Sequence, residues 1–321
     1  MNILVTGAAG FIGSNLTDAL LNAGHTVVGL DNFSTGKREN LTHLNNTGAF
    51  TLIEGDIRDR GTCEKACKGV DVVFHEAALG SVPRSINDPM TTTDVNIGGF
   101  VNMLFAAKEA GIKRFIYAAS SSTYGDSKVL PKVEDQIGKP LSPYAITKYV
   151  NELYAGNFHD LYGIDCVGLR YFNVFGRRQD PNGAYAAVIP KFALALMSHQ
   201  APTINGDGSY SRDFTYVDNV IQANLLAGFT TSKAALNTVY NVACGERTTL
   251  NELFYGLRTA LGKFDPEILG ISPIYGPNRG GDIPHSLADI SKIKKLLGYD
   301  PNVRVQSGIA LAAEWYYEYL R

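Results

Sequence analysis

The sequence predicts an α/β protein in which a doubly wound parallel β-sheet is joined to a smaller C-terminal α/β part. Two features of the chain support this prediction. Short apolar segments alternate with amphipathic helical patterns through the first half of the sequence, and this regularity ends after Tyr171. Such an alternation is typical of parallel strands in one sheet with helices on both faces.

The expected strands are short runs of apolar and β-branched residues, as in strands that are buried on both faces. Between them, apolar residues recur at helical spacing. We expect strands at 3–6, 26–30, 51–54, 72–75, 115–119 and 165–170, and helices at 14–21, 62–68, 96–110 and 143–162.

The second half of the chain has a less regular pattern, and we expect it to form a second domain over 173–321. The first domain should cover 1–172 and also include part of 213–243, so that the two are interleaved. Loops rich in Gly, Pro and Asn are expected at 176–183, 201–211 and 273–284, and helices at 187–197, 217–228, 250–261, 291–297 and 307–319.

The composition excludes several classes of function. The chain has 321 residues, of which 45% are hydrophobic, enough for a full core. The net charge is −2 and the basic residues are scattered, so we expect neither nucleic acid nor a membrane surface as a partner. No apolar run reaches the ~18 residues of a membrane-spanning helix. The chain opens with a strand rather than a signal sequence, and we expect a cytoplasmic protein.

The four cysteines are expected to be reduced thiols. No Cys or His pattern around them completes a zinc site, so we predict no metal. These residues are Cys63, Cys67, Cys166 and Cys244.

A glycine-rich loop, Gly7-Ala8-Ala9-Gly10-Phe11-Ile12-Gly13, joins the first strand to the first helix. Glycines let the backbone approach a pyrophosphate, and the helix N-terminus adds amide donors and a positive dipole. Asp31 ends the second strand. Its separation in sequence from the glycine-rich loop is close to the ~20 residues usual for an acid that binds the ribose. Because a carboxylate accepts from ribose hydroxyls and repels a 2′-phosphate, the sequence predicts a Rossmann-type site for NAD. Only Lys37 argues for NADP.

Other residues are expected to complete the cofactor site. Asp56 and Ile57 close the third strand and are expected to bracket the adenine. Ala77 and Ala78 offer small side chains where a cofactor would lie, although small residues also serve helix–sheet packing. His75 is expected to be a core histidine rather than a catalyst. The predicted cofactor-binding residues are Gly7, Gly10, Phe11, Ile12, Gly13, Asp31, Asn32, Ser34, Gly36, Asp56, Ile57, Ala77, Ala78, Tyr144, Lys148 and Tyr171.

Tyr144 and Lys148 lie four residues apart on an expected helix, and their side chains should therefore share one face. A tyrosine has a pKa near 10 and must lose ~3 units, worth ~4 kcal/mol, to act as a base at neutral pH. A cation at ~4 Å in a partly buried site supplies about this much. The pair is therefore predicted to transfer a proton during oxidation of an alcohol.

The helix that carries this pair has clear boundaries in the sequence. Ser142 is a suitable N-cap, Pro143 a suitable first residue and Gly163 a suitable C-terminal stop. A second Tyr-x-x-x-Lys motif, from Tyr124 to Lys128, runs through Gly-Asp-Ser and is predicted to form a turn instead.

These residues together resemble the extended short-chain dehydrogenases/reductases and, among them, the nucleotide-sugar 4-epimerases. The resemblance covers essentially the whole chain. Segments 78–85 and 176–185 are most similar to epimerases that prefer N-acetylated UDP-hexosamines. The other matching segments are 7–13, 56–57, 74–78, 120–125, 142–144 with Lys148, 170–176, 212–214 and 279–282.

The resemblance implies catalytic roles for residues in the first domain. Tyr144 is implied as the catalytic tyrosine. Lys148 is implied as the residue that binds the nicotinamide ribose and lowers the pKa of Tyr144. Ser120 is implied as the hydroxyl that relays or steadies the proton, with Ser121 and Ser122 left open as alternatives.

The resemblance also implies a substrate site. Arg212 and Arg279 match arginines that bind the diphosphate in this family. A guanidinium is suited to this role because it can bind phosphate in a bidentate manner. Ser286 matches a position in the sugar pocket where a bulky Tyr would crowd a 2-substituent and a small residue leaves room for an N-acetyl group. The implied substrate-binding residues are Gly80, Ser81, Ser121, Ser122, Asn173, Gln179, Ala187, Val188, Lys191, Arg212, Arg279, Asp282 and Ser286.

The implied activity is C4 epimerisation of UDP-N-acetylglucosamine to UDP-N-acetylgalactosamine through a transient 4-keto sugar, with NAD as cofactor. A homodimer through helices at 96–110 and 144–160 is also implied. UDP-glucose remains open as a substrate. So does UDP-N-acetylglucosaminuronic acid, whose carboxylate Arg84, Arg177, Arg178 or Lys191 would meet.

Two further classes remain as alternatives. Related dehydratases usually carry an Asp-Glu pair where this chain has Ser121-Ser122, which argues against a 4,6-dehydratase; a decarboxylase is the other enzyme in this class. A non-enzymatic NAD-binding regulator would be expected to lack Tyr144 or Lys148, and both are present.

Overall fold

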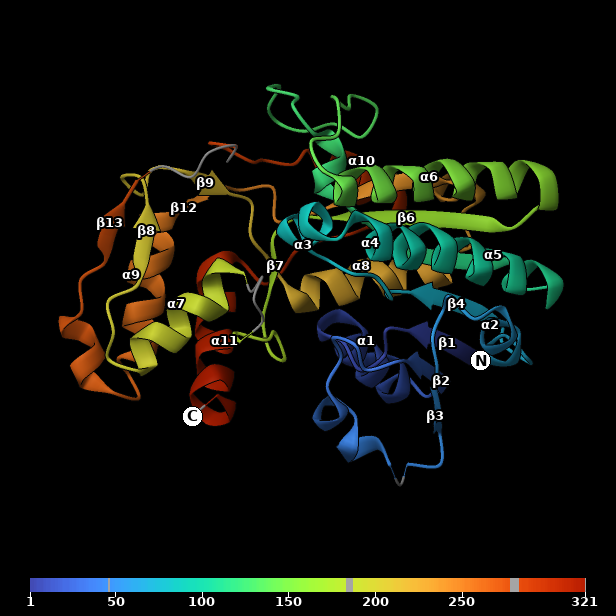
Figure 1. Cartoon of the computed structure of the whole chain (residues 1–321), viewed down its shortest axis with the longest axis horizontal. Helices are drawn as coiled ribbons and strands as arrows, with labels where there is room; N and C mark the ends of the chain where they lie inside the picture. Colours follow the sequence, from blue (N-terminus) through green and yellow to red (C-terminus); the bar gives the residue numbers. More distant parts are fainter. Residues whose placement is uncertain (46, 183–186, 278–282, 321) are drawn as a thin grey trace.

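A computed structural model of the chain confirms the α/β class (Figure 1). It describes residues 1–45, 47–182, 187–277 and 283–320. Its main sheet has seven strands that all run parallel, in the order β11-β6-β5-β4-β1-β2-β3. The strands are β1 (Asn2–Thr6), β2 (Thr26–Asp31), β3 (Phe50–Glu54), β4 (Val72–His75), β5 (Arg114–Ser120), β6 (Asp165–Tyr171) and β11 (Thr238–Val242).

Helices cover both faces of this sheet. One layer contains α1 (Phe11–Asn22), α8 (Val217–Phe229) and α10 (Ser291–Leu297), and the other contains α2 (Arg60–Ala66), α5 (Phe100–Glu109) and α6 (Pro143–Tyr162). Because successive strand residues point to opposite faces, Ile3 and Val5 join one hydrophobic core and Leu4 joins the other. The sheet is therefore buried on both sides.

The second part of the chain is the group of elements at the left of Figure 1. Its helices α7 (Val188–Met197), α9 (Leu250–Leu261) and α11 (Val305–Tyr319) pack against one another. Residues of all three belong to the same buried cluster as Ile3 and Val5 of β1, so the two parts share one core. Three short strand pairs complete it: β7 (Val174–Phe175) with β10 (Thr215–Tyr216), β9 (Ser211–Arg212) with β12 (Thr248–Thr249), and β8 (Thr203–Asn205) with β13 (Ile274–Gly276).

The boundaries predicted for α6 are confirmed. The Ser142 side chain accepts a hydrogen bond from the Ala145 amide (3.1 Å), and Pro143 is the first helical residue. Gly163 has a φ of 68°, the left-handed conformation that ends many helices without steric cost to glycine. Tyr144 is therefore the second residue of helix α6.

The second Tyr-x-x-x-Lys motif forms a turn, as predicted. Residues Ser121–Tyr124 make one 3-10 turn, and Gly125 follows with a φ of 53°. Tyr124 is buried and donates to Asn241 Oδ1 (2.6 Å), whereas Lys128 is exposed. The two side chains therefore do not share a face.

Several elements differ from the expectation. The strand β11 was not predicted; it extends the sheet by pairing with β6, and residues 172–237 separate the two strands in the sequence. The helix predicted from residue 96 begins as a π-helix, Asp94–Gly99. The chain also has two unpredicted short helices, α3 (Val82–Asn87) and α4 (Pro89–Thr93), and 3-10 turns at Arg38–Asn40, Thr42–Leu44, Lys233–Ala235 and Pro266–Gly270.

We propose the same domain division as the sequence suggested, 1–172 and 173–321 with part of 213–243 in the first domain. The proposal is supported by α8, which packs on the sheet, and by β11, which adds a strand to it. Limited proteolysis that released a stable 1–172 fragment lacking both elements would contradict it.

All four cysteines are free and buried. Among the described residues, no group of three or more His, Cys, Asp or Glu side chains is placed to hold a metal ion. Within the same residues, none of the helices combines the length and apolar character needed to cross a bilayer.

We predict that Glu152→Gln destabilises the protein by about 3–5 kcal/mol, because it leaves a buried guanidinium without its counter-ion. Arg170 donates to both carboxylate oxygens of Glu152 (2.8 and 2.7 Å), and the two side chains are only 3% and 8% exposed. Urea unfolding measures the change.

The matched control is Glu64→Gln, which breaks the exposed pair between Arg60 and Glu64. It is expected to cost about 0.5 kcal/mol or less. Equal losses of stability in the two variants would contradict the prediction that the buried ion pair contributes more than the exposed one.

Candidate active site

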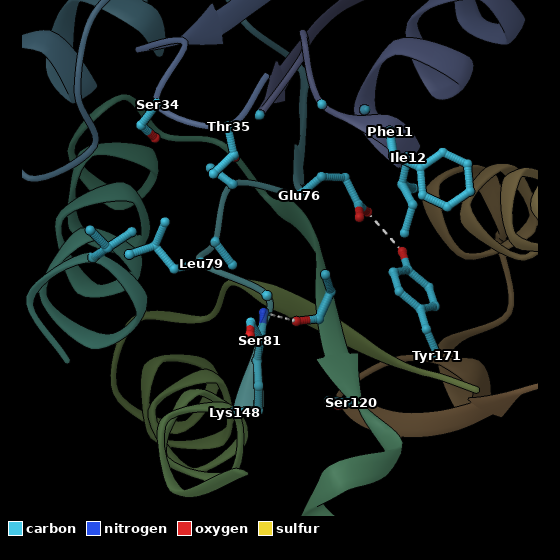
Figure 2. A pocket seen from close by; sticks show the side chains of 18 of the residues that line it. Phe11, Ile12, Ser34, Thr35, Glu76, Leu79, Ser81, Ser120, Lys148 and Tyr171 are labelled. Atoms are coloured by element: carbon cyan, nitrogen blue, oxygen red, sulfur yellow. Dashed lines mark hydrogen bonds between the residues drawn. The ribbon is translucent and has the colours of Figure 1, made fainter. Parts of the chain in front are cut away.

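A cavity of about 560 Å³ opens at the carboxyl ends of the central strands (Figure 2). The loops after β1 and β4 leave the sheet in different directions there, because β1 lies between β2 on one side and β4 on the other. Ligands of doubly wound sheets bind at such a point. Its walls come from the loops after β1, β2, β3 and β4, from the end of β5, from the start of α6 and from the segment after β6.

The glycine-rich loop forms one wall of this cavity. A Cβ at Gly13 would lie 2.0 Å from the Gly7 oxygen, and a Cβ at Gly7 would lie 2.8 Å from the Ala77 amide nitrogen. Gly10 is the N-cap residue of α1 and has no side chain to bond the free amides of the first turn. That turn also carries no acidic residue. The loop thus leaves the N-terminus of α1 open to an anion.

Asp31 fastens the loop after β2 to the glycine-rich loop. Its two oxygens accept from the amides of Ala9 (2.8 Å) and Phe33 (2.7 Å). Burial raises the pKa of Asp31, and these two bonds oppose the rise. Each carboxylate oxygen has a second lone pair, so Asp31 remains able to accept from a ribose hydroxyl. Lys37, which argued for NADP, forms an ion pair with Asp180 (2.9 Å).

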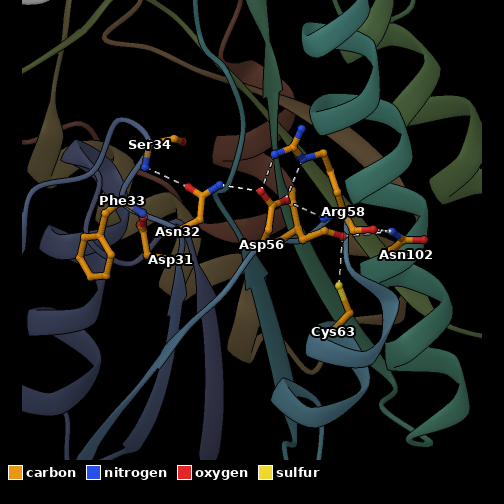
Figure 3. Close-up of polar contacts among 9 residues, drawn as sticks. Asp31, Asn32, Phe33, Ser34, Asp56, Arg58, Cys63 and Asn102 are labelled. Atoms are coloured by element: carbon orange, nitrogen blue, oxygen red, sulfur yellow. Dashed lines mark hydrogen bonds and ion pairs between the residues drawn. The ribbon is translucent and has the colours of Figure 1, made fainter.

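Asp56 orders the neighbouring part of the cavity (Figure 3). Arg58 donates to both of its oxygens (3.0 and 2.8 Å), and Asn32 donates to Oδ2 (2.8 Å). The bonds from Arg58 hold the pKa of Asp56 at about 2. The bond between Asn32 and Asp56 thus links the segments that follow β2 and β3 at the cavity wall.

Ser120, Tyr144 and Lys148 meet at the opposite end of the cavity. Burial raises the pKa of Tyr144, and a hydrogen bond with Ser120 opposes the rise. Ser122 donates its hydroxyl (2.8 Å) and its amide (3.1 Å) to the Ser120 oxygen. Ser120 thus links the Ser122 hydroxyl to the phenol of Tyr144.

Lys148 is oriented differently from what the sequence suggested. Its ammonium donates to the Ala118 carbonyl (2.8 Å), and burial lowers its pKa to about 8. The expected lowering of the Tyr144 pKa by Lys148 is therefore wrong for the structure described, where burial outweighs the other contributions and the pKa of Tyr144 rises. Both side chains still face the same cavity.

His75 is a core residue, as expected. Its Nδ1 lies 3.0 Å from the Thr6 hydroxyl, and its ring packs against Phe100 and Phe115. Burial and the nearby Lys148 lower the pKa of His75 to about 3, so the ring is neutral at neutral pH.

The sequence reasoning missed Glu76 and Asn224. Tyr171 donates to Glu76 Oε1 (2.7 Å) and accepts from the Asn224 amide (2.9 Å). Glu76 was noted only as part of a matching segment. Its position directly after a buried strand, at the carboxyl edge of the sheet, is the signal that would have found it. Asn224 lies in the interior of α8 and gave no signal.

Most of the predicted cofactor-binding residues line the cavity. Gly36 is the exception among them, and a Cβ there would meet Ala9 and Asp31 at about 2.9–3.0 Å. The lining residues from that prediction are Gly7, Gly10, Phe11, Ile12, Gly13, Asp31, Asn32, Ser34, Asp56, Ile57, Ala77, Ala78, Tyr144, Lys148 and Tyr171.

The implied substrate-binding residues are more dispersed. Arg212 and Ser286 lie together, because Arg212 donates to Pro284 O (3.1 Å) and Ser286 donates to Ser211 O (3.1 Å). Arg279 and Asp282 lie outside the described residues. Gly80, Ser81, Ser121, Asn173 and Gln179 line the cavity, whereas Ser122, Val188, Lys191, Arg212 and Ser286 are not among its described lining residues.

A second cavity of about 290 Å³ adjoins the first and shares Gly80, Ser81 and Gln179 with it. Ala187, implied in the sugar pocket, lies here. The cationic side chains on its wall are Lys37, Arg84 and Arg178.

The first cavity fits NAD. A backbone cradle without Cβ atoms and an uncapped helix N-terminus suit a pyrophosphate, and the Asp31 carboxylate suits a ribose. We expect 10–13 to hold the pyrophosphate, Asp31 and Asn32 to hold the adenosine end, and Tyr144 with Lys148 to hold the nicotinamide end.

Comparison with known proteins gives consistent matches over the whole chain. The model of the NAD dependent epimerase/dehydratase family matches residues 3–243. A relative named UDP-glucose 4-epimerase, from Mycolicibacterium smegmatis, is 38% identical over 98% of each chain.

Two solved structures superpose closely on the chain. The UDP-N-acetylglucosamine 4-epimerase of Methanobrevibacter ruminantium M1, in complex with UDP-N-acetylmuramic acid, has a TM-score of 0.91 and 41% identity over 99% of this chain and 98% of that one. The UDP-glucuronic acid 4-epimerase of Bacillus cereus, in complex with UDP-glucuronic acid and NAD, has a TM-score of 0.87 and 33% identity over 99% of both chains.

We predict that Gly13→Ala lowers both stability and dinucleotide retention. Its Cβ would overlap the Gly7 carbonyl, and relieving such overlap typically costs about 1–3 kcal/mol. The measurements are the melting temperature and the dinucleotide content of the purified protein.

Gly61→Ala is the control. Gly61 lies in the first turns of α2, and a Cβ there would meet only Asp59, at 3.7 Å or more. It should retain the dinucleotide and gain up to about 1 kcal/mol. If Gly13→Ala kept its full dinucleotide content, the glycine-rich loop would not be the binding site of the pyrophosphate.

Proposed function

The chain belongs to the NAD dependent epimerase/dehydratase family, and from this premise we propose that it is a UDP-sugar 4-epimerase that prefers N-acetylated hexosamines. The observation that carries the reaction type is the meeting of Ser120, Tyr144 and Lys148 at one end of a cavity that fits a dinucleotide. UDP-sugar 4-epimerases among the relatives support the substrate class.

The mechanism requires a group that both removes and returns a proton at the sugar C4 oxygen. When bound, NAD⁺ supplies the electron acceptor for reversible oxidation at C4. Tyr144 accepts the hydroxyl proton, directly or through Ser120, and later returns it. Burial raises the pKa of Tyr144, so the phenol must lose its own proton before it can accept one, and the Ser120 hydrogen bond favours the phenolate.

Lys148 and the diphosphate-binding residues hold the ligands in place and do not transfer the proton. Lys148 is held by the Ala118 carbonyl and faces the cavity, where its ammonium can bind the nicotinamide ribose. Arg212, Arg279 and Asn173 are proposed to hold the UDP diphosphate while the 4-keto sugar turns to present its other face. Return of the hydride to the opposite face of the C4 carbon would invert that centre, and Tyr144 then returns the proton to the C4 oxygen.

The preference for an N-acetyl group rests on Ser286. Its side chain is small and partly exposed, and its amide donates to Ser211 O, next to the proposed diphosphate-binding Arg212. A small residue beside the diphosphate site leaves space for a 2-substituent on the sugar. The Methanobrevibacter ruminantium relative, a UDP-N-acetylglucosamine 4-epimerase, supports this choice.

A second candidate substrate is a UDP-sugar that carries a carboxylate. Arg84 and Arg178 lie on the wall of the second cavity, beside Gly80 and Ser81 of the first. The Bacillus cereus relative acts on UDP-glucuronic acid. Turnover of UDP-glucose, UDP-N-acetylglucosamine and UDP-N-acetylglucosaminuronic acid, with products identified by NMR and no NAD added, would separate the candidates.

We retain a homodimer as part of the proposal. Leu153 and Leu161 of α6 are more than half exposed, so α6 presents apolar side chains to its surroundings. Sedimentation velocity that gave only monomers would contradict this part.

We predict that Tyr144→Phe lowers kcat for C4 epimerisation by about 10²–10⁴-fold, because it removes the group that transfers the proton. Dinucleotide retention should change little. Tyr154→Phe, an exposed position on the same helix, is the matched control and should keep wild-type turnover. Wild-type turnover in Tyr144→Phe would refute the assigned role.

We predict that Ser286→Tyr lowers kcat/KM for UDP-N-acetylglucosamine by about 10- to 100-fold relative to UDP-glucose, because overpacking costs ~1–3 kcal/mol. Ser286→Ala should keep the substrate preference of the wild type. An equal loss on both substrates in Ser286→Tyr would exclude Ser286 as the determinant of sugar size.

A further inference from the structure

A partly buried carboxylate at the catalytic end of the first cavity takes no part in the proton transfer described above. Glu76 directly follows β4, and its amide donates to Thr6 O of β1 (3.2 Å). It therefore lies where the two central strands of the sheet separate. Its side chain lines the cavity and points toward the hydroxyl of Tyr171 (Figure 2).

A chain of hydrogen bonds fixes this carboxylate. Tyr171 of β6 donates to Glu76 Oε1 (2.7 Å), and Asn224 of α8 donates to the Tyr171 oxygen (2.9 Å). Three elements of the fold thus hold the Glu76 side chain in one orientation. A carboxylate on the protein surface would lack this set of hydrogen bonds.

Glu76 also lies within electrostatic range of Lys148. Burial raises the pKa of Glu76 to about 7, and the Tyr171 bond and the Lys148 charge oppose the rise. The positive charge of Lys148 would repel a second positive charge bound beside it. A negative charge on Glu76 offsets this repulsion.

We propose that Glu76 is a positioning residue whose negative charge, near the nicotinamide end of the cavity, favours oxidised over reduced dinucleotide. The inference rests on the proposed function, because it takes NAD as the ligand. The nicotinamide ring is positively charged when oxidised and neutral when reduced. A fixed carboxylate beside it therefore stabilises only the oxidised form. An epimerase needs this form at the start of every cycle.

The test is the midpoint potential of the bound dinucleotide in the purified holoenzyme, with no sugar nucleotide present. The holoenzyme is equilibrated with redox dyes at about pH 8, where Glu76 is mostly ionised, and the absorbance of reduced nicotinamide is read. The key variant is Glu76→Gln, which keeps an acceptor for Tyr171. Its potential should rise by about 30 mV, equivalent to a tenfold change in the ratio of affinities for the two forms.

One variant separates charge from structure. Glu76→Asp keeps the charge on a shorter side chain, so it should shift the potential much less than Glu76→Gln. Glu76→Ala gives a second neutral variant and should raise the potential as Glu76→Gln does.

Three results would overturn the proposal: an unchanged potential in both neutral variants, an equal shift in Glu76→Asp, or loss of the dinucleotide from both neutral variants. The sugar-free measurement also keeps the two proposals apart. A shifted potential in a protein that turns over no UDP-sugar would leave the role of Glu76 standing and refute the proposed function alone.

Discussion

The close approach of Gly7, Gly13 and Ala77 is the constraint on which the rest of the site depends. A Cβ on Gly13 would meet the Gly7 carbonyl, and a Cβ on Gly7 would meet the backbone at Ala77. Only glycine allows the loop after β1 to lie this near both α1 and the segment after β4. The open helix N-terminus, and the cavity that begins there, follow from this contact.

The catalytic end of the cavity depends on burial more than on pairwise attraction. Burial raises the pKa of Tyr144 and of Glu76 and lowers that of Lys148, which brings the last two toward neutrality. Hydrogen bonds from Ser120 and Tyr171 act against burial at two of these groups. Glu76 and Lys148 are therefore able to change protonation state near neutral pH, whereas Tyr144 depends on the hydrogen bond from Ser120 to favour the phenolate that its proposed role requires.

Most of the sheet could be predicted because its strands and their order of appearance are local patterns. The helix that carries Tyr144 was predicted to its first and last residues, since Ser142, Pro143 and Gly163 are local signals. The strand β11 was missed because it lies in the second half of the chain, where strand and helix patterns no longer alternate regularly. The lowering expected for the Tyr144 pKa was wrong because helical spacing fixes which face Lys148 shares, not which atom its ammonium binds.

The fold class, the dinucleotide loop and the Tyr144–Lys148 pair could be predicted, because each is encoded by residues near one another in the chain. The contacts of those residues depend on the tertiary structure. It brought Ser120 rather than Ser122 to the phenol, engaged Lys37 with Asp180, and joined Glu76 to Tyr171 and Asn224. These contacts join residues from separate strands and helices, so only the packing of the sheet could establish them.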